Sequence, residues 1–455
     1  ACGSMYLYQV VVVLDTCFWW ALWPLWLLGW PEETADLEYF YPTALLSTAP
    51  EILFFWVARM VIMGLHFLGE VPFHAVLLHP TVKDERGRRM SKSLGTGVDP
   101  LDLIRRYGSD ATRFSLLFQC ASDQDLRFGE ERTEMARNFC NKIWNASRFV
   151  LMNLGEGFAP NPEAPARVQA EGSLAERWVL SRYGDMLARL SAALAEYQMA
   201  EAARAVHSFF WSEFCDWFVE LCKPPLREGG AVAQRARETL HYLLEGTLRA
   251  LHPFMPFITE EIWQQLPGAG ESIMVSRWPQ ADPAWRDQAA EAEMDALMAV
   301  VTAARKLRAD QGVAPSARVG LTVLAASAEA RRVVEANREA ILSLVRGRAL
   351  MVGADLAGRP AIAESLLCAG EPALVAIDAA ASEGELRAHQ ERLEKELARL
   401  AKEEQRLAQK LANAEFRARA PEPVVEKARN QLAHVKERRE TAAAQLAEVK
   451  RVLRS

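Results

Sequence analysis

A short basic and hydroxyl-bearing segment is the part of the sequence best suited to catalysis. Its residues are Arg89, Met90, Ser91, Lys92 and Ser93. A lysine in a mobile loop stabilises the negative charge that develops on a departing pyrophosphate, and small residues let the backbone approach phosphates closely. We therefore expect the five residues to bind a nucleoside triphosphate, with Lys92 as the catalytic residue. The alternative is a solvated turn that happens to contain Ser and Lys.

The residues after this segment predict two helices that would support it. Asp99 followed by Pro100 is a favourable helix start, and Gly108 is suited to end that helix. A second helix is expected directly after Gly108. This context favours a functional loop over a chance turn.

The elements before the segment predict half of an α/β nucleotide-binding fold. Residues 45–48 are expected to form a short strand, and residues 75–79 a second one with the continuous apolar pattern typical of a parallel sheet. Residues 52–68 are apolar nearly all round, so we expect a buried helix between the strands. Ligands of such folds lie at the carboxyl ends of the strands, where the basic segment would also lie.

Composition favours a multidomain cytoplasmic protein. The 455 residues are too many for one ordinary core, and half are hydrophobic and a quarter charged. The seven cysteines are scattered without a CxxC pair, so we predict neither a disulfide framework nor a metal site. The apolar run 10–30 contains Asp15, Pro24 and Gly29, so we expect buried strand and loop there, and no membrane span.

The middle of the chain predicts a helical bundle that opens near residue 128. Its later helices are expected at 173–196, 199–221, 232–250 and 256–266. The proline pair Pro224-Pro225 is expected to end one of them. Trp211, Phe214 and Trp217 lie at helical spacing and are expected in the bundle core, the alternative being platforms for base stacking.

The last seventy residues predict a coiled-coil hairpin with a basic surface. Two apolar series with heptad spacing occupy 386–411 and 425–453, and Pro421 and Pro423 separate them. Residues 386–455 carry 17 Lys and Arg against 11 Glu, whereas the whole chain has a net charge of −6. A basic arm on an acidic body suits a polyanion such as tRNA. A self-contained dimerisation arm is the alternative.

The predicted fold class is therefore mainly α, with a partial α/β Rossmann half at the N-terminus. Its parts are a partial α/β half at 10–127, a helical bundle at 128–290, a small mixed α/β or linker segment at 291–380 and the coiled-coil arm at 381–455.

Several motifs together resemble the C-terminal half of the valyl-tRNA synthetase family, which belongs to class I. Residues 89–93 resemble that family's KMSKS loop, with Arg89 in place of the first Lys. Motifs at 13–16, 22–24, 29–34 and 54–60 also match, so the resemblance implies that residues 10–127 are the second half of that family's Rossmann catalytic domain. Matches at 211–217 and 251–257 imply that the bundle at 128–290 is its anticodon-binding bundle. Matches at 410–413, 416, 420–422 and 424–427 lie in its C-terminal coiled coil. The isoleucine enzyme typically ends in a Cys-rich zinc module, which this sequence lacks, so the valine family is preferred.

The resemblance implies a ligase that joins valine to tRNA(Val) with ATP as substrate and Mg²⁺ bound to the ATP. It implies that His79 binds ATP together with residues 89–93. It also implies that Glu51, Ile52 and Cys17 bind the amino acid, with the Glu51 carboxylate on its ammonium group.

Three motifs of the expected site depart from the family pattern. Cys17 stands where the family has a Trp that walls the valine pocket, and Pro80 stands where it has Gly. Residues Ala49-Pro50 replace a Gly and an aromatic residue, and Glu51 replaces an Asp that is one methylene shorter. These changes indicate relaxed or altered function.

The family's HIGH signature and its editing domain have no counterpart in the sequence. We therefore expect a missing N-terminal half as a partner, and no activity from this chain alone. The alternatives to a valine–tRNA ligase portion are a non-catalytic tRNA-binding module and a fragment of an isoleucine–tRNA ligase.

Overall fold

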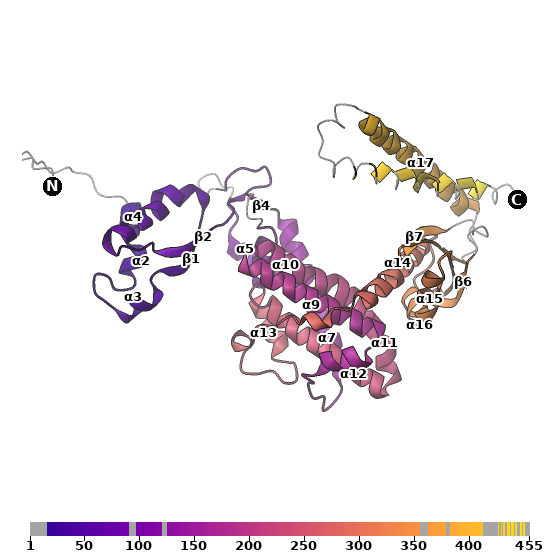
Figure 1. Ribbon diagram of the computed structural model, residues 1–455, viewed down its shortest axis with the longest axis horizontal. Helices are drawn as coiled ribbons and strands as arrows, with labels where there is room; N and C mark the ends of the chain where they lie inside the picture. The colour runs from indigo at the N-terminus through magenta and orange to yellow at the C-terminus, as the bar shows by residue number, and fades with distance from the viewer. Residues whose placement is uncertain are drawn as a thin grey trace, which may run out of the picture. The chain divides into compact units, whose positions relative to one another are not determined.

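The computed structural model describes residues 16–90, 97–120, 125–354, 363–378 and 383–412, together with helical positions between 426 and 450 (Figure 1). Contacts divide the chain into two compact units. The first comprises Ala1–Ala164, Tyr183–Asp216 and Arg237–Pro283, and the second comprises Pro165–Arg182, Trp217–Ala236 and Ala284–Ser455.

The first unit begins with a small α/β element. Helices α1 (Thr16–Trp20), α2 (Trp23–Trp26) and α3 (Ala35–Phe40) precede strand β1 (Thr43–Thr48), which pairs in parallel with β2 (Phe73–Leu78). Both strands and their parallel pairing were predicted and are confirmed. Strand β3 (Val82–Lys83) pairs in parallel with β4 (Leu126–Arg127).

The segment between β1 and β2 is helical, as predicted, but it is not buried. It begins with the 3₁₀ turn η1 (Pro50–Ile52), widens into the π-helix η2 (Leu53–Val57) and continues as α4 (Ala58–Phe67). Its inner face packs Val57 and Met60 on Leu46 and Phe73. A two-stranded sheet covers only that side, so the other apolar side chains remain exposed, and the prediction of burial is wrong.

The tryptophan-rich run before β1 also differs from its prediction. Its described part forms the short helices α1 and α2, where strand and loop were expected. Pro24 and Leu25 are buried, but Trp19, Trp20, Trp23 and Trp26 are between 45% and 71% exposed. The two short helices therefore bury Pro24 and Leu25 and leave these four indole rings largely exposed.

The two helices after the basic segment form as predicted. In α5 (Pro100–Tyr107) the Asp99 carboxylate accepts a hydrogen bond of 2.9 Å from the Leu101 amide. Gly108, with a φ of +92°, ends α5, and α6 (Ser109–Leu117) follows. Asp110 at the start of α6 is buried and accepts a 2.7 Å hydrogen bond from the Ile258 amide, which ties α6 to the bundle.

The helices predicted for the middle of the chain are present. They are α7 (Glu130–Leu154), α8 (Ala164–Glu171), α9 (Leu174–Ala195), α10 (Met199–Ser208), the π-helix η3 (Phe209–Phe218), α11 (Val219–Glu228), α12 (Gly230–Leu251) and α13 (Pro256–Trp263). The expected break at Pro224-Pro225 is wrong. The helix tolerates the two missing amide donors and ends at Gly229, whose φ of +81° an L side chain rarely adopts.

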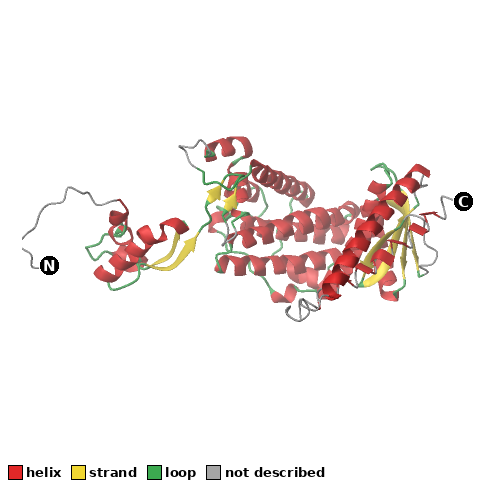
Figure 2. Cartoon of the chain, turned by 90° about the horizontal axis from the view of Figure 1, so that it is seen from above, coloured by secondary structure: helices red, strands yellow, loops and turns green. Residues whose placement is uncertain are grey.

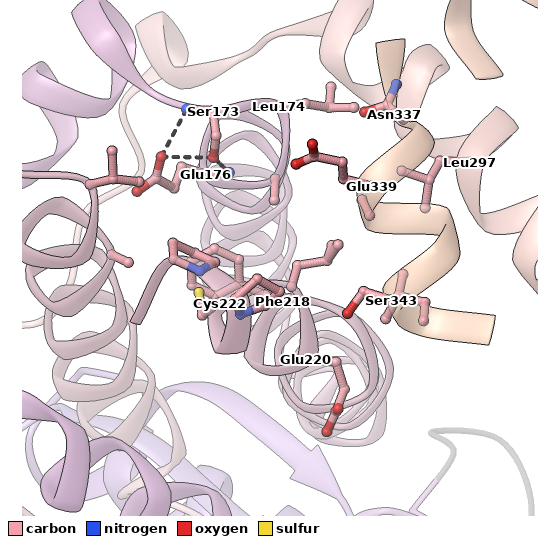
Figure 3. A pocket seen from close by; sticks show the side chains of 18 of the residues that line it. Ser173, Leu174, Glu176, Phe218, Glu220, Cys222, Leu297, Asn337, Glu339 and Ser343 are labelled. Atoms are coloured by element: carbon pink, nitrogen blue, oxygen red, sulfur yellow. Dashed lines mark hydrogen bonds between the residues drawn. The ribbon is translucent and has the colours of Figure 1, made fainter. Parts of the chain in front are cut away.

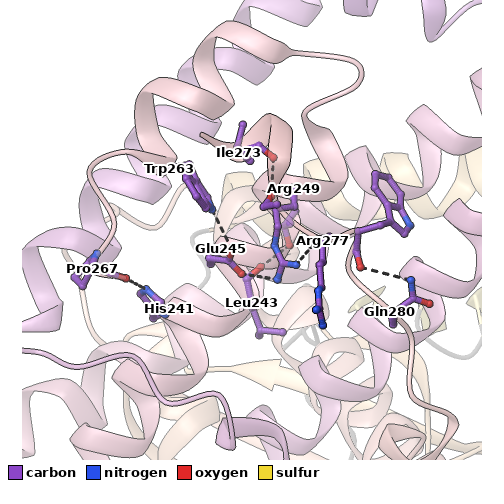
Figure 4. Close-up of polar contacts among 12 residues, drawn as sticks. His241, Leu243, Glu245, Arg249, Trp263, Pro267, Ile273, Arg277 and Gln280 are labelled. Atoms are coloured by element: carbon purple, nitrogen blue, oxygen red, sulfur yellow. Dashed lines mark hydrogen bonds and ion pairs between the residues drawn. The ribbon is translucent and has the colours of Figure 1, made fainter. Parts of the chain in front are cut away.

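Polar side chains join the bundle helices of the first unit (Figure 4). The Glu245 carboxylate of α12 accepts hydrogen bonds from Trp263 Nε1 at 3.0 Å and from Arg249 at 2.7 Å. Arg249 also donates to the Arg277 carbonyl at 2.6 Å, and His241 Nε2 lies 2.9 Å from the Pro267 carbonyl. These bonds hold α13 and the chain after it against α12.

The second unit contains a four-stranded mixed sheet in the order β6-β5-β8-β7 (yellow arrows in Figure 2). Its strands are β5 (Val319–Ala325), β6 (Gly347–Gly353), β7 (Glu364–Cys368) and β8 (Glu371–Ile377). Helices α14 (Gln288–Asp310), α15 (Ala328–Ala336) and α16 (Arg338–Val345) pack on it. A mixed α/β or linker segment was expected here, and the long helix α14 was not predicted.

The C-terminal part contains α17 (Glu383–Ala412), which covers the first predicted heptad series. Leu393, Leu400 and Leu407, seven residues apart, are buried. Val435, Ala442 and Val449 have the same spacing and are also buried. The expected turn at Pro421 and Pro423 lies outside the described residues.

Candidate functional site

The entry to the basic segment is a tight turn. Residues Arg89 and Met90 are described, whereas Ser91, Lys92 and Ser93 lie outside the described residues. The Asp84 carboxylate accepts hydrogen bonds from the Arg88 amide at 2.7 Å and from Arg88 Nε at 2.8 Å. The bond from the Arg88 amide lowers the pKa of Asp84, so its carboxylate stays charged and fixes the turn.

Two predicted site residues meet directly. Glu51, in η1 after strand β1, forms an ion pair with Arg89, whose guanidinium nitrogen lies 3.3 Å from the carboxylate. The other carboxylate oxygen accepts a hydrogen bond from Thr81 Oγ1 at 3.4 Å. The acid proposed to bind an ammonium group is thus held by the first residue of the phosphate-binding segment.

The other predicted site residues lie at the carboxyl ends of β1 and β2. The amide of His79 donates to the carbonyl of Thr48 at 3.0 Å, and the His79 side chain is exposed. Ile52 is 38% exposed, and Trp56 Nε1 donates to Thr48 Oγ1 at 3.1 Å. The side chain of Cys17 lies outside the described part of the chain.

The described residues offer no protein metal site at this place. No group of three or more His, Cys, Asp or Glu side chains is arranged to hold a metal ion in the described ranges.

A set of exposed apolar side chains surrounds the same sheet, and the sequence did not predict it. We call it the exposed apolar set. It consists of Trp19, Trp20, Trp23, Trp26, Phe54, Phe55, Ile62 and Leu65. Phe54 is 82% exposed, and the rings of Trp20 and Trp56 lie 5.9 Å apart. Soluble proteins rarely leave so many large apolar side chains uncovered unless they bind another surface.

One helical run in the same region, Pro50–Phe67, has the length and composition of a membrane span, and 17% of it is buried. Length and apolar composition alone cannot distinguish a span from a helix covered by protein. Its position directly between two paired parallel strands is typical of an α/β fold.

The tryptophans of the bundle are less buried than predicted. Phe214 is fully buried, as expected, but Trp211 and Trp217 are half-buried. The Lys142 ammonium lies 4.2 Å from the ring centroid of Trp211, and the Arg305 guanidinium lies 5.4 Å from that of Trp217. Each indole therefore packs on the core with one part of its ring and faces a cation with another.

A cavity of about 750 Å³ in the second unit contains none of the predicted site residues (Figure 3). Within it the Glu176 carboxylate is buried and accepts hydrogen bonds from Ser173 at 2.7 Å and from Arg235 at 3.0 Å. Burial raises the pKa of the Cys222 thiol well above its usual range, so this cysteine is not a nucleophile. These polar contacts stabilise the fold.

Three family models match consecutive parts of the chain. Residues 2–129 match tRNA synthetases class I (I, L, M and V). Residues 176–324 match the anticodon-binding domain of tRNA ligase, and residues 385–450 match the valyl tRNA synthetase tRNA binding arm. The third model is specific to one amino acid.

Curated relatives agree with that model. The valine–tRNA ligase of Carboxydothermus hydrogenoformans is 45% identical over 431 residues, which are 95% of this chain and 48% of the relative. That of Geobacter sulfurreducens is 44% identical over 455 residues, 99% of this chain and 50% of the relative. The chain belongs to the valine–tRNA ligase family. It spans about half the length of these valine–tRNA ligases, and the matches favour the valine reading over an isoleucine–tRNA ligase fragment.

Solved structures are more distant from this member of the valine–tRNA ligase family. A LeuRS from Agrobacterium radiobacter K84, in a ternary complex with tRNA, covers 60% of this chain with a TM-score of 0.48 and 18% identity. A methionyl-tRNA synthetase from Mycobacterium tuberculosis covers 56% with a TM-score of 0.42.

Proposed function

We propose that this chain provides the C-terminal half of a valine–tRNA ligase. The observation that carries the proposal is the ordered match of its parts to valine–tRNA ligases at 45% identity over 95% of the chain. The substrates would be valine, ATP with its Mg²⁺, and tRNA(Val), and the cytoplasm would be the site of the reaction.

The reaction has two steps. The valine carboxylate attacks the α-phosphorus of ATP, forming valyl-AMP and releasing pyrophosphate. A hydroxyl of the terminal ribose of the tRNA then attacks the valyl carbonyl, and AMP leaves. The protein contributes positioning and electrostatic stabilisation to such transfers. Lys92 would stabilise the departing pyrophosphate, while residues 89–93 and His79 would bind ATP.

The ion pair between Glu51 and Arg89 suggests how the binding of ATP and the binding of valine are coupled. When the Arg89 guanidinium turns to the phosphates, the Glu51 carboxylate becomes free to bind the valine ammonium group. Both side chains are partly exposed, at 36% for Glu51 and 73% for Arg89, so the exchange costs little desolvation. Ile52 and Cys17 would line the amino-acid pocket.

A second polypeptide segment would complete the catalytic fold. The exposed apolar set surrounds a sheet of only two strands, β1 and β2. The valine–tRNA ligases matched above are about twice as long as this chain. We propose that a segment equivalent to their N-terminal half covers the exposed apolar set and brings the HIGH signature to the ATP.

The C-terminal residues would form a coiled-coil hairpin that binds tRNA. Buried residues recur every seven positions in both series. Ion pairs support the pairing, with Lys450 at 2.9 Å from Glu394 and Arg438 at 3.0 Å from Glu396. The remaining basic side chains would contact the tRNA backbone.

Valine-dependent ATP–pyrophosphate exchange tests the proposal. We expect no exchange with this chain alone and clear exchange after a relative's N-terminal half is added, with Lys92→Ala as the inactive control. The non-catalytic alternative predicts tRNA(Val) binding but no exchange under either condition, and that result would replace our proposal.

A further inference from the structure

A basic cavity lies in the first unit, apart from the predicted substrate residues. Its volume is about 610 Å³. The basic side chains that line it come from four elements: Lys83 from β3, Arg127 from β4, Arg132 from α7 and Arg204 from α10. Residues more than one hundred positions apart in the sequence thus contribute cations to one space.

Two of these cations are already paired, which fixes the walls of the cavity. Lys83 forms an ion pair with Asp125, and this hydrogen bond lowers the pKa of Asp125. Arg204 pairs with Glu201 at 2.6 Å and donates to the Phe118 carbonyl at 3.3 Å. The remaining donors of Arg204 are therefore held in a defined position.

The other two cations have no counter-charge. Neither Arg127 nor Arg132 forms an ion pair or a side-chain hydrogen bond with the described residues. Arg132 also lies in the first turn of α7, where the helix dipole disfavours positive charge. Like charges that converge without an anion repel one another, so the arrangement is best explained by a bound anion.

The shape and donors of the cavity suit a phosphate group. Guanidinium groups bind phosphate oxygens through two parallel hydrogen bonds, and both unpaired groups here are arginines. The turn that leads to residues 89–93 borders the cavity at Gly87, where a side chain would meet the Arg127 guanidinium at 3.5 Å. Gly87 has a φ of +77°, a backbone conformation that favours glycine, whereas the contact itself leaves ordinary van der Waals space.

We propose that Arg127 and Arg132, supported by Arg204 and Lys83, bind a backbone phosphodiester of the tRNA. This inference rests on the proposed function, because it takes tRNA as the partner. The open cavity and the exposed arginines suit a backbone that passes over the surface. Free pyrophosphate presents the same kind of phosphate oxygens, and the experiment below distinguishes tRNA from pyrophosphate as the bound anion.

The test measures tRNA(Val) binding by the full chain as a function of salt concentration. The variant is Arg127→Gln with Arg132→Gln. The matched control is Arg286→Gln with Arg318→Gln, which removes two exposed arginines outside the cavity. Loss of a phosphate contact reduces the slope of log affinity against log salt by about one. We expect the cavity variant to lose about one to two units of slope and about tenfold in affinity at low salt, and the control to lose neither.

A conservative variant and a second ligand complete the test. Arg127→Lys with Arg132→Lys keeps the charge and should keep the slope, while its affinity falls because two-bond recognition is lost. Titration with inorganic pyrophosphate tests whether the cavity binds that anion and not tRNA. If the glutamine variant loses pyrophosphate binding but keeps the salt dependence of tRNA binding, the assignment to RNA is overturned.

The possible failures are separable. Equal tRNA binding and slope in the cavity variant and in the unmodified chain would overturn this inference and leave the proposed function intact. Absence of tRNA binding by the unmodified chain would overturn both.

Discussion

The carboxylate of Glu51 lies 3.3 Å from the guanidinium of Arg89, although a helical segment and the strands β2 and β3 separate the two residues in the chain. Because η1 follows β1 and residue 89 follows β3, the pair joins the expected amino-acid side of the site to its expected phosphate side. The exposure of both groups makes this pair weak and easily exchanged.

The first prediction concerns the strength of this pair. In a double-mutant cycle with Glu51→Gln and Arg89→Ala, we expect a coupling energy within about 1 kcal/mol, since solvent screens exposed ion pairs. Urea unfolding of the four proteins measures it. A coupling of several kcal/mol would mean that the pair is a structural lock that does not open for substrates.

The second prediction concerns the exposed apolar set. Phe54→Ser should change the free energy of unfolding by less than about 1 kcal/mol, because Phe54 is 82% exposed. The same variant should abolish rescue of valine-dependent exchange by an added N-terminal half. Urea unfolding and the exchange assay give the two readings.

A buried phenylalanine is the matched control for that prediction. Phe139 is fully buried, and Phe139→Ala should cost about 3–5 kcal/mol. Full rescue of the Phe54→Ser protein would show that the exposed apolar set is not where the missing half binds.

The third prediction concerns the arm. Removal of residues 386–455 takes away a local excess of six positive charges, counted as 17 Lys and Arg against 11 Glu. Binding of tRNA should weaken, and its salt dependence should flatten, because fewer counterions are released. Filter binding at several salt concentrations measures both. If the shortened chain binds as tightly as the full chain, the arm has a structural or dimerising role.

The fourth prediction concerns the seam of the arm. Leu400 is 1% exposed, so Leu400→Lys would place an unpaired charge among apolar side chains. Loss of pairing should reduce the helical circular-dichroism signal of the full chain, because long helices of this kind depend on packing. Lys402, on the exposed side of the same helix, gives the control variant Lys402→Gln. An unchanged spectrum in Leu400→Lys would contradict the hairpin.

The fifth prediction concerns acid sensitivity. Burial lowers the pKa of His207 from its usual value of 6.5, with a smaller contribution from Lys142. The unfolded chain then binds this proton more readily than the folded chain. Stability is therefore retained above about pH 6.5 and is lost as the pH falls from 6.5 toward the lowered pKa.

His207→Gln should reduce this loss, whereas His66→Gln, at an exposed position, should not. Unfolding midpoints measured between about pH 7.5 and about pH 5 give the comparison. Parallel pH profiles for the His207→Gln protein and the unmodified chain would show that another group controls the acid response.

The sequence by itself predicted the elements whose cause is local. The apolar residues 75–78 mark strand β2, the start of α5 follows from Asp99 and Pro100, and its end follows from Gly108. The proline pair at 224 was misleading because helix continuation there depends on the neighbouring turns, and the stop comes at Gly229. Local rules work where one or two side chains satisfy the backbone, and they fail where packing decides.

Only the tertiary structure decided which of these elements meet and which remain uncovered. An apolar helix such as 52–68 looks the same in sequence whether another layer covers it or not, so its exposure could not be predicted. The pairing of Glu51 with Arg89 and the convergence of Arg127, Arg132 and Arg204 join residues that are distant along the chain. The sequence determined the family and predicted its phosphate-binding segment through residue types and short spacings, whereas long-range contacts arise only when the folded backbone brings the elements together.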